Sequence, residues 1–139
     1  MLTGQYDYNI DDKGRLNFPA KFREEMGATF TVTRWLDGCL VAFPEKEWGR
    51  MQALIEEKSL VKARNLKRIL YASAVQVQPD KQGRILLPGH LRGHAKLDKD
   101  VTIIGVGSYA EFWDTAAWRK LEEDIDDHAL AAAMEEMGL

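Results

Sequence analysis

Two small sets of side chains in this 139-residue chain could, by type and spacing, bind a metal or do acid–base chemistry. His90 and His94 lie four residues apart, as two metal ligands on one helix face would. Gly93 between them weakens such a helix, and no third ligand is apparent, so we do not expect a metal site. Asp11 and Asp80 resemble a catalytic carboxylate pair only by symmetry, because each occupies a turn position that favours Asp structurally.

The other signatures of enzymes are absent from the sequence. It contains no phosphate-binding glycine loop, dinucleotide fingerprint, nucleophile elbow or zinc-protease motif. The single cysteine, Cys39, has no histidine near it in sequence, excludes an intrachain disulfide and fits a reducing compartment. Residues 1–5 lack the basic and apolar regions of a signal peptide, and no apolar run approaches the ~20 residues of a membrane span. We therefore predict a cytoplasmic protein that is not an enzyme, needs no cofactor and has no membrane partner.

The two aspartates open the two copies of an internal repeat. The first copy runs from Asp11 to Arg23 and the second from Asp80 to Arg92, 69 residues later. Asp, Gly, Arg, Pro and Arg recur at five of the thirteen aligned positions. Chance alone would match about one position, so the chain is a duplication.

Each copy predicts the same succession of elements. Asp followed three residues later by Gly (Asp11 and Gly14, Asp80 and Gly83) favours a tight turn, in which Gly takes a positive φ. A short alternating strand follows, and a proline then begins a helix over 20–26 or 89–95. The segments before each turn alternate as well, so we predict a hairpin followed by a helix, with an arginine just past the tip. Such a hairpin could also define the fold without any wider role.

The duplication continues beyond this motif. Phe43 precedes Trp48 by five residues, as Trp113 precedes Trp118, and the same apolar helical face follows both tryptophans. The four tryptophans are expected to be core anchors. Further strands are predicted over 29–33, 39–43, 101–106 and 109–113, and helices over 44–57, 59–72 and 128–139. We divide the chain into a first repeat with connector helices (1–72), a second repeat (73–127) and a helical tail (128–139).

The net charge of −3 hides an uneven distribution. Residues 111–139 carry nine acidic and two basic side chains, a balance of −7, whereas the residues before them carry seventeen basic and thirteen acidic, a balance of +4. This asymmetry indicates a basic binding surface and an acidic tail. A solvated acidic helix would account for the tail equally well.

The repeated turn, strand, proline and helix resemble the swapped-hairpin DNA-binding proteins of the AbrB and MazE type. Those chains usually carry one copy of the motif and build a β-barrel from two subunits. Two copies in one chain, each followed by a helix that begins near a tryptophan, resemble the MraZ family over about residues 1–127. The fold expected from this resemblance is α+β, a swapped-hairpin or double-psi barrel made from two internal repeats, with flanking helices.

The resemblance implies a DNA-binding transcriptional regulator, generally a repressor, of the division and cell-wall gene cluster. It would bind direct repeats in promoter DNA upstream of its own operon, assemble with itself into a homo-oligomeric ring and associate with the nucleoid. The residues expected to contact DNA are basic side chains in or near the two tips: Lys13, Arg15, Lys21, Arg23, Lys81, Arg84 and Arg92. The residues expected to shape the loops are Asp11, Gly14, Asp80 and Gly83.

The two copies are not equally basic. Gln82 stands where the first copy has Lys13, and His90 stands where it has Lys21. We therefore expect the first copy to contribute more to DNA binding. The alternatives are a structural ring that binds protein and an antitoxin-like module that neutralises a partner. The duplication argues against the antitoxin, since such chains usually have one copy and a long acidic tail. Salt-sensitive binding to promoter DNA distinguishes the regulator from the scaffold.

Overall fold

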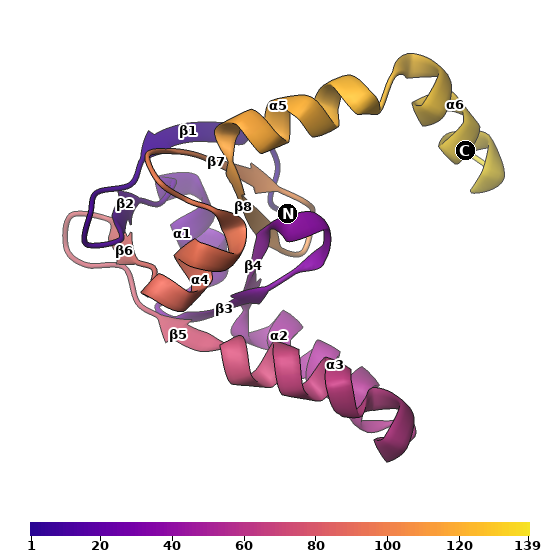
Figure 1. The fold of residues 1–139 in the computed structure, drawn as a ribbon, viewed down its shortest axis with the longest axis horizontal. Helices are drawn as coiled ribbons and strands as arrows, with labels where there is room; N and C mark the ends of the chain where they lie inside the picture. The colour runs from indigo at the N-terminus through magenta and orange to yellow at the C-terminus, as the bar shows by residue number, and fades with distance from the viewer.

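The computed structural model describes residues 1–139 and contains eight strands, six α-helices and one short 3-10 helix (Figure 1). The strands are β1 (Gln5–Asn9), β2 (Arg15–Asn17), β3 (Phe30–Arg34), β4 (Leu40–Pro44), β5 (Val75–Val77), β6 (Arg84–Leu86), β7 (Asp100–Gly105) and β8 (Ala110–Asp114). The helices are α1 (Ala20–Met26), α2 (Glu45–Glu56), α3 (Leu60–Ser73), α4 (Gly89–Ala95), α5 (Thr115–Asp124) and α6 (Asp127–Glu136), with the 3-10 turn η1 at Leu36–Gly38.

The two repeats exchange strands with each other. Six strands form one sheet in the order β1-β7-β8-β4-β3-β5, and β2 and β6 form a separate two-stranded sheet. The first strand of each copy therefore pairs with the other copy: β1 lies antiparallel to β7, and β5 lies antiparallel to β3. The central neighbours β4 and β8 also come from different copies. The structure thus confirms the α+β class and the duplicated swapped-hairpin fold.

Two expectations about strand pairing were wrong. The segments on either side of each tip do not form a local ladder, because β1 pairs with β7 while β2 pairs with β6. Nor do the strands close into one hydrogen-bonded barrel, since the two sheets remain separate. Three-residue strands such as β2 and β6 are too short for a stable hairpin alone. Pairing them with each other directs one apolar face from both copies into a common core.

The core lies between the two sheets and contains side chains from both repeats. Phe18 is at its centre and is 2 % exposed. Its ring stacks on Phe30 at 4.9 Å between centroids and approaches Phe22 and Phe112 at 6.0 Å each. Leu16 and Ile85, which face each other across the β2–β6 pair, are buried below it. The repeats therefore share one core.

The predicted helices form where their sequence signals place them. Pro19 and Pro88 precede α1 and α4, and Gly27, with φ of 84°, ends α1. Asp114 caps α5 by accepting a hydrogen bond from the Ala117 amide at 3.1 Å, as a side-chain N-cap should. Of the four tryptophans, Trp48 and Trp113 are buried and the other two are partly buried. Their role as core anchors is confirmed.

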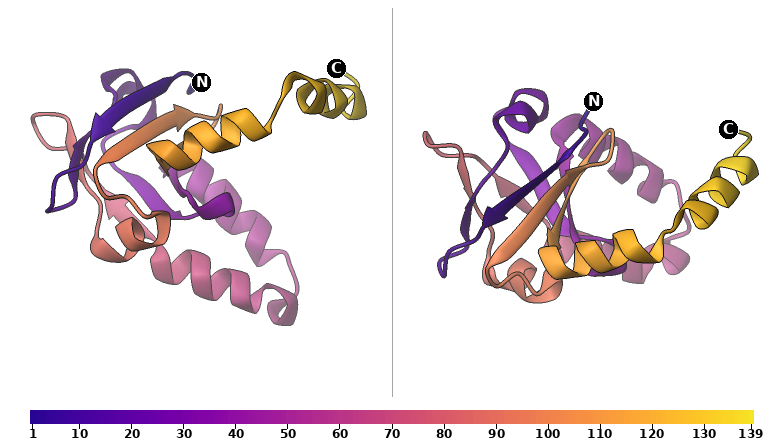
Figure 2. Two further views of the ribbon diagram at one scale, coloured as in Figure 1. Left: turned by 45° about the horizontal axis from the view of Figure 1, so that its top comes forward. Right: turned by 90° about the horizontal axis from the view of Figure 1, so that it is seen from above.

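Two helical arms leave the body on the side opposite the β2–β6 tips (Figures 1 and 2). One arm is the antiparallel pair α2 and α3, tied to the sheet by the hydroxyl of Thr33, which donates to the Leu70 carbonyl at 2.6 Å. The other arm is α5 followed by α6, and every residue from 122 to 139 is exposed. None of the helices has the length and apolar character required to cross a membrane.

Candidate nucleic-acid interface

The antiparallel pair of β2 and β6 has one buried face and one outward face. Leu16 and Ile85 point into the core, so by strand alternation their neighbours point outward. Arg15 lies opposite Leu86, and Asn17 lies opposite Arg84. We call these four outward side chains, two arginines, an amide and a leucine, the ribbon face: Arg15, Asn17, Arg84 and Leu86.

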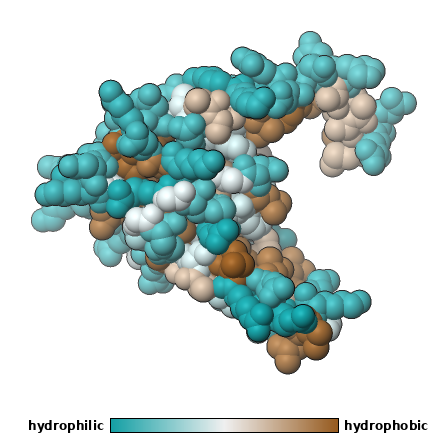
Figure 3. Space-filling model, in the orientation of Figure 1, coloured by the Kyte–Doolittle hydropathy of each residue, from teal (hydrophilic) through white to brown (hydrophobic).

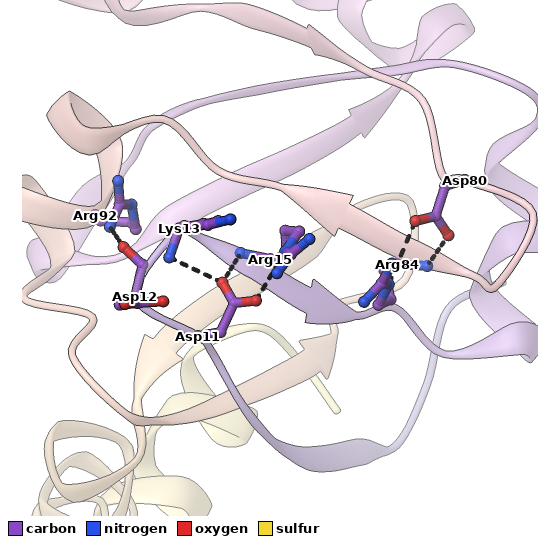
Figure 4. A network of polar contacts seen from close by, with 7 residues as sticks. All are labelled: Asp11, Asp12, Lys13, Arg15, Asp80, Arg84 and Arg92. Carbon is purple, nitrogen blue, oxygen red and sulfur yellow. Dashed lines mark hydrogen bonds and ion pairs between the residues drawn. The ribbon is translucent and has the colours of Figure 1, made fainter.

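A carboxylate clasp fixes the first tip (Figure 4). Asp11 Oδ1 accepts hydrogen bonds from the backbone amides of Lys13 and Arg15 at 3.0 and 2.8 Å, and Oδ2 accepts from Arg15 Nε at 2.8 Å. The Gly14 amide donates to the Asp11 carbonyl at 3.0 Å, which closes the turn. The Arg15 side chain uses only Nε in this clasp, so the N–H groups of its two terminal nitrogens remain available to a ligand.

The second tip repeats the clasp with the same atoms. Asp80 Oδ1 accepts from the amides of Gln82 and Arg84, both at 2.9 Å, and Oδ2 accepts from Arg84 Nε at 3.3 Å. Gly83 closes the turn as Gly14 does, and both glycines have positive φ, 78° and 88°. The loop-shaping role expected for Asp11, Gly14, Asp80 and Gly83 therefore has a specific geometry in both copies.

The clasps also determine the charge of the two carboxylates. Backbone hydrogen bonds, led by the one from Arg15, hold the pKa of Asp11 below its usual value. The backbone amide of Arg84 has the same leading effect on the pKa of Asp80. Both carboxyls are thus ionised at neutral pH, and each arginine is held by a charged acceptor.

Each tip is held by the other copy. The Leu87 amide donates to the Gly14 carbonyl at 2.8 Å, and the Phe18 amide donates to the Gly83 carbonyl at 3.0 Å. These bonds extend the β2–β6 pairing into both loops. The tips therefore lie together at one end of the molecule, and strand exchange places the arginines of both copies on one surface.

Two of the seven basic residues expected to contact DNA are engaged in this packing. Arg92 lies against Gly14, where its Nε donates to the Leu87 carbonyl at 3.0 Å and its Nη1 to the Asp12 carbonyl at 3.5 Å. Arg23 lies against Gly83 in the corresponding place, with a buried Nε that has no hydrogen-bond partner. Both side chains are half-buried and support the tip of the opposite copy.

The other five expected residues are not engaged in supporting the opposite tip. Lys13 and Lys81 are exposed on the two tip loops, and Lys21 is exposed on α1. Arg15 and Arg84 are partly exposed on the ribbon face, with 41 % and 37 % of their side chains accessible.

Sequence reasoning missed two members of the ribbon face, Asn17 and Leu86. Both are exposed, and Leu86 is 57 % exposed, which is unusual for a leucine in a strand. The signal was available, because a period of two along each strand places Asn17 beside Arg15 and Leu86 beside Arg84. An amide and an aliphatic side chain beside two arginines give the surface polar and apolar contacts as well as charge.

The two histidines set aside as metal ligands have separate surroundings. His90 Nε2 lies 3.1 Å from the Ser73 carbonyl. His94 lies near Arg34 and Trp35, where burial, followed by the charge of Arg34, lowers its pKa. No group of three or more potential metal ligands converges in the chain.

The exchanged strands, the shared core and the paired clasps define a swapped-hairpin protein with both halves in one chain. The sequence pattern of the family described as "MraZ protein, putative antitoxin-like" matches residues 1–69 and again 70–139. The chain belongs to the MraZ family.

Curated relatives cover nearly the whole chain. A "Transcriptional regulator MraZ" of Carboxydothermus hydrogenoformans is 47 % identical over 120 residues, 85 % of this chain and 84 % of its own. The protein of that name from Caldanaerobacter subterraneus subsp. tengcongensis is 45 % identical over 128 residues, 91 % of this chain and 90 % of its own. The Moorella thermoacetica protein is 40 % identical over 135 residues, 96 % of this chain and 94 % of its own. All three are named as transcriptional regulators.

Proposed function

We propose that this protein regulates transcription by binding promoter DNA with the ribbon face and the two tip loops. The observation that carries the proposal is that strand exchange brings Arg15 and Arg84 onto one exposed two-stranded ribbon, each held by a clasp. The major groove of DNA is wide enough to admit such a ribbon. The names of the relatives support the same function.

The ribbon face divides into groups with different tasks. The terminal nitrogens of Arg15 and Arg84 can donate in pairs to a guanine edge or to a phosphate. Asn17 can pair with adenine, and Leu86 offers an apolar contact for a thymine methyl group. The exposed side chains of Lys13, Lys21 and Lys81 supply positive charge for contacts with phosphates. Arg23 and Arg92 act mainly by supporting the tips.

The decisive experiment measures binding of the full chain to DNA from upstream of its own gene. Arg15→Ala should weaken specific binding by about 1–3 kcal/mol, which is about 5- to 150-fold in Kd. Arg50→Ala is a matched control, because Arg50 is an exposed arginine on α2 in the opposite arm, paired with Glu47. Equal affinity for Arg15→Ala and the wild type, with folding intact, removes the ribbon face from the site.

The unequal charge of the copies can be tested by exchanging two aligned residues. Lys13→Gln should weaken DNA binding, and Gln82→Lys should strengthen it, since the two positions occupy equivalent places in the clasps. If neither exchange changes affinity at low salt, the first copy has no electrostatic advantage.

The finer part of the proposal is a homo-oligomeric ring, repressive in most contexts, that binds adjacent direct repeats. One ribbon face offers few basic groups, so a single repeat should bind weakly and adjacent repeats much more tightly through effective concentration. Binding should also fall steeply with salt. Changing the repeat spacing by half a helical turn should abolish the gain. A single repeat that binds as tightly as the full array would remove the ring from recognition.

The family description also contains the word antitoxin-like, which keeps a protein-binding role as the second candidate. The two functions differ in their dependence on the ribbon face. Loss of promoter binding in Arg15→Ala favours the regulator. A partner protein that binds Arg15→Ala and the wild type equally, without salt-dependent DNA binding by either, favours the alternative.

A further inference from the structure

An apolar groove lies between α3 and the turn that follows β3. It has a volume of about 150 Å³ and is lined by five apolar side chains and two polar ones: Trp35, Leu36, Leu66, Ile69, Leu70, Arg34 and His94. Leu66 and Ile69 are 51 % and 47 % exposed although they border the buried face of α3. In a single chain this apolar surface is left in contact with water.

Two polar atoms beside the groove also lack partners. Arg34 Nε and His94 Nε2 are buried, and neither makes a hydrogen bond within the chain. Buried polar atoms are almost always satisfied, and Arg34 Nε, which can only donate, is suited to an acceptor from outside the chain. Because Arg34 is cationic and forms no ion pair, a segment with carboxylates as well as apolar side chains would suit this groove.

Helix α6 has this chemistry. Leu130, Ala133, Met134 and Met137 recur at i, i+3, i+4 and i+7 and therefore form one apolar face. Leu130 and Met134 are 53 % and 44 % exposed, and no part of α6 is buried against the body. A ten-residue helix is marginal in water by itself, so it gains stability only by covering this face.

The charges of the two arms are complementary. Four basic side chains on α3 or just before it have no acidic partner: Lys58, Lys62, Arg64 and Arg68. The α5–α6 arm carries an excess of carboxylates, of which five lie between 122 and 127 and two at 135–136. Apolar surface is visible on both arms (Figure 3). Opposite charges around an apolar contact favour one orientation of docking.

We propose that α6 of one copy of this chain docks along the α3 groove of a second copy, with its apolar face on Leu66 and Ile69 and its carboxylates toward Arg34 and the α3 cations. The inference rests on the self-assembly in the proposed function but not on DNA binding. Each chain would give one helix and accept another, which is a head-to-tail contact that can repeat from copy to copy.

The anchoring of α5 makes a second copy the occupant. Arg119 on α5 pairs with Asp7 at 2.9 Å, and Trp118 Nε1 donates to Gln5 at 3.0 Å. Both contacts fix α5 to β1. Only residues 125 and 126 separate α5 from α6, so α6 is held at the end of its arm, away from the α3 of the same chain (Figure 1).

The first test measures the mass of the full chain by light scattering across a dilution series. Met134→Glu on α6 and Ile69→Glu in the groove should each weaken assembly at least about tenfold in dissociation constant, as one desolvated charge in an apolar contact does. Ala132→Glu on the opposite face of α6 is the matched control and should assemble normally. Circular dichroism checks that all three variants fold.

The second test locates the contact. Met134→Cys and Ile69→Cys chains are prepared separately and mixed under mild oxidation, with the buried Cys39 left in place. A cross-linked pair that forms only in the mixture supports docking between copies. Oligomers that persist unchanged in Met134→Glu overturn the docking and leave self-assembly intact. A wild-type chain that is monomeric at every concentration overturns both. A third chain carries both Met134→Cys and Ile69→Cys; a cross-link that forms within this chain and not in the mixture shows that α6 folds back on its own groove and overturns docking between copies.

Discussion

Replacing the two tip glycines, Gly14 and Gly83, with alanine should lower the free energy of unfolding by unequal amounts. Gly14 and Gly83 have φ of 88° and 78°, so each alanine incurs a left-handed strain of about 1–2 kcal/mol. A gain of about 0.4–1 kcal/mol from the stiffer unfolded chain offsets part of it. The surroundings then separate the two sites. A β-carbon at 14 would clash with the Leu87 carbonyl oxygen, whereas the three atoms nearest to one at 83 all belong to the guanidinium of Arg23.

The difference arises because the Leu87 carbonyl belongs to the backbone, whereas the Arg23 guanidinium is the far end of a flexible side chain. Moving Leu87 disrupts two hydrogen bonds: the one that its amide donates to the Gly14 carbonyl, and the one that its carbonyl accepts from Arg92 Nε. Those losses are about 1 kcal/mol for the neutral bond and about 1.5–3 kcal/mol for the charged one. Gly14→Ala should therefore destabilise the fold by about 3–5 kcal/mol, and Gly83→Ala by about 1 kcal/mol.

Urea unfolding followed by tryptophan fluorescence, at one fixed protein concentration, measures both free energies of unfolding. Equal losses at the two sites, or a larger loss at Gly83, would refute the argument, because the Leu87 carbonyl would then yield as readily as a side chain.

Three further changes test the packing of the fold by thermal or urea unfolding. Burial raises the pKa of Glu111 above its ordinary value near 4.5, so the folded state loses stability as pH rises through the raised pKa. Glu111→Gln keeps the acceptor for Trp113 Nε1, and above about pH 4.5 it should become increasingly more stable than the wild type. A stability difference that does not change with pH contradicts this. Thr33→Val removes the 2.6 Å bond to the Leu70 carbonyl and should cost about 1–2 kcal/mol; no loss would mean that α3 is held by apolar contacts alone. Phe18→Ala should cost about 3–5 kcal/mol, and a loss below about 1 kcal/mol would show that the core collapses around the gap.

Local signals in the sequence predicted local structure well. The bounds of α1 and α4 were predicted correctly because a proline precedes each helix and an apolar residue recurs every three or four positions. The turns at Asp11 and Asp80 were predicted from one aspartate that accepts backbone hydrogen bonds and one glycine that takes a positive φ. Each of these features is decided within about five residues of the chain.

The features that were missed depend on distant residues. The ladders of β1 with β7 and of β2 with β6 join strands from different copies. Hydrophobic alternation predicts that a segment is a strand, but not which other strand it pairs with. Arg23 and Arg92 resembled free cations, because nothing in the sequence shows that each packs on a glycine about 60 to 80 positions away. Strand alternation alone places Asn17 beside Arg15 and Leu86 beside Arg84, but only the pairing of β2 with β6 shows that all four side chains share one surface.

Exchange of strands between the repeats has a consequence for synthesis of the chain. At about 5–20 residues per second, the ribosome needs about 3–14 seconds to add the 69 residues that separate the two tips. Throughout that interval β1, β2 and one edge of β3 lack their partners, since these lie in the second repeat. Pairings this distant close slowly, and unpaired edges invite association between nascent chains. The first repeat therefore cannot complete its native strand pairing until its own duplicate is made.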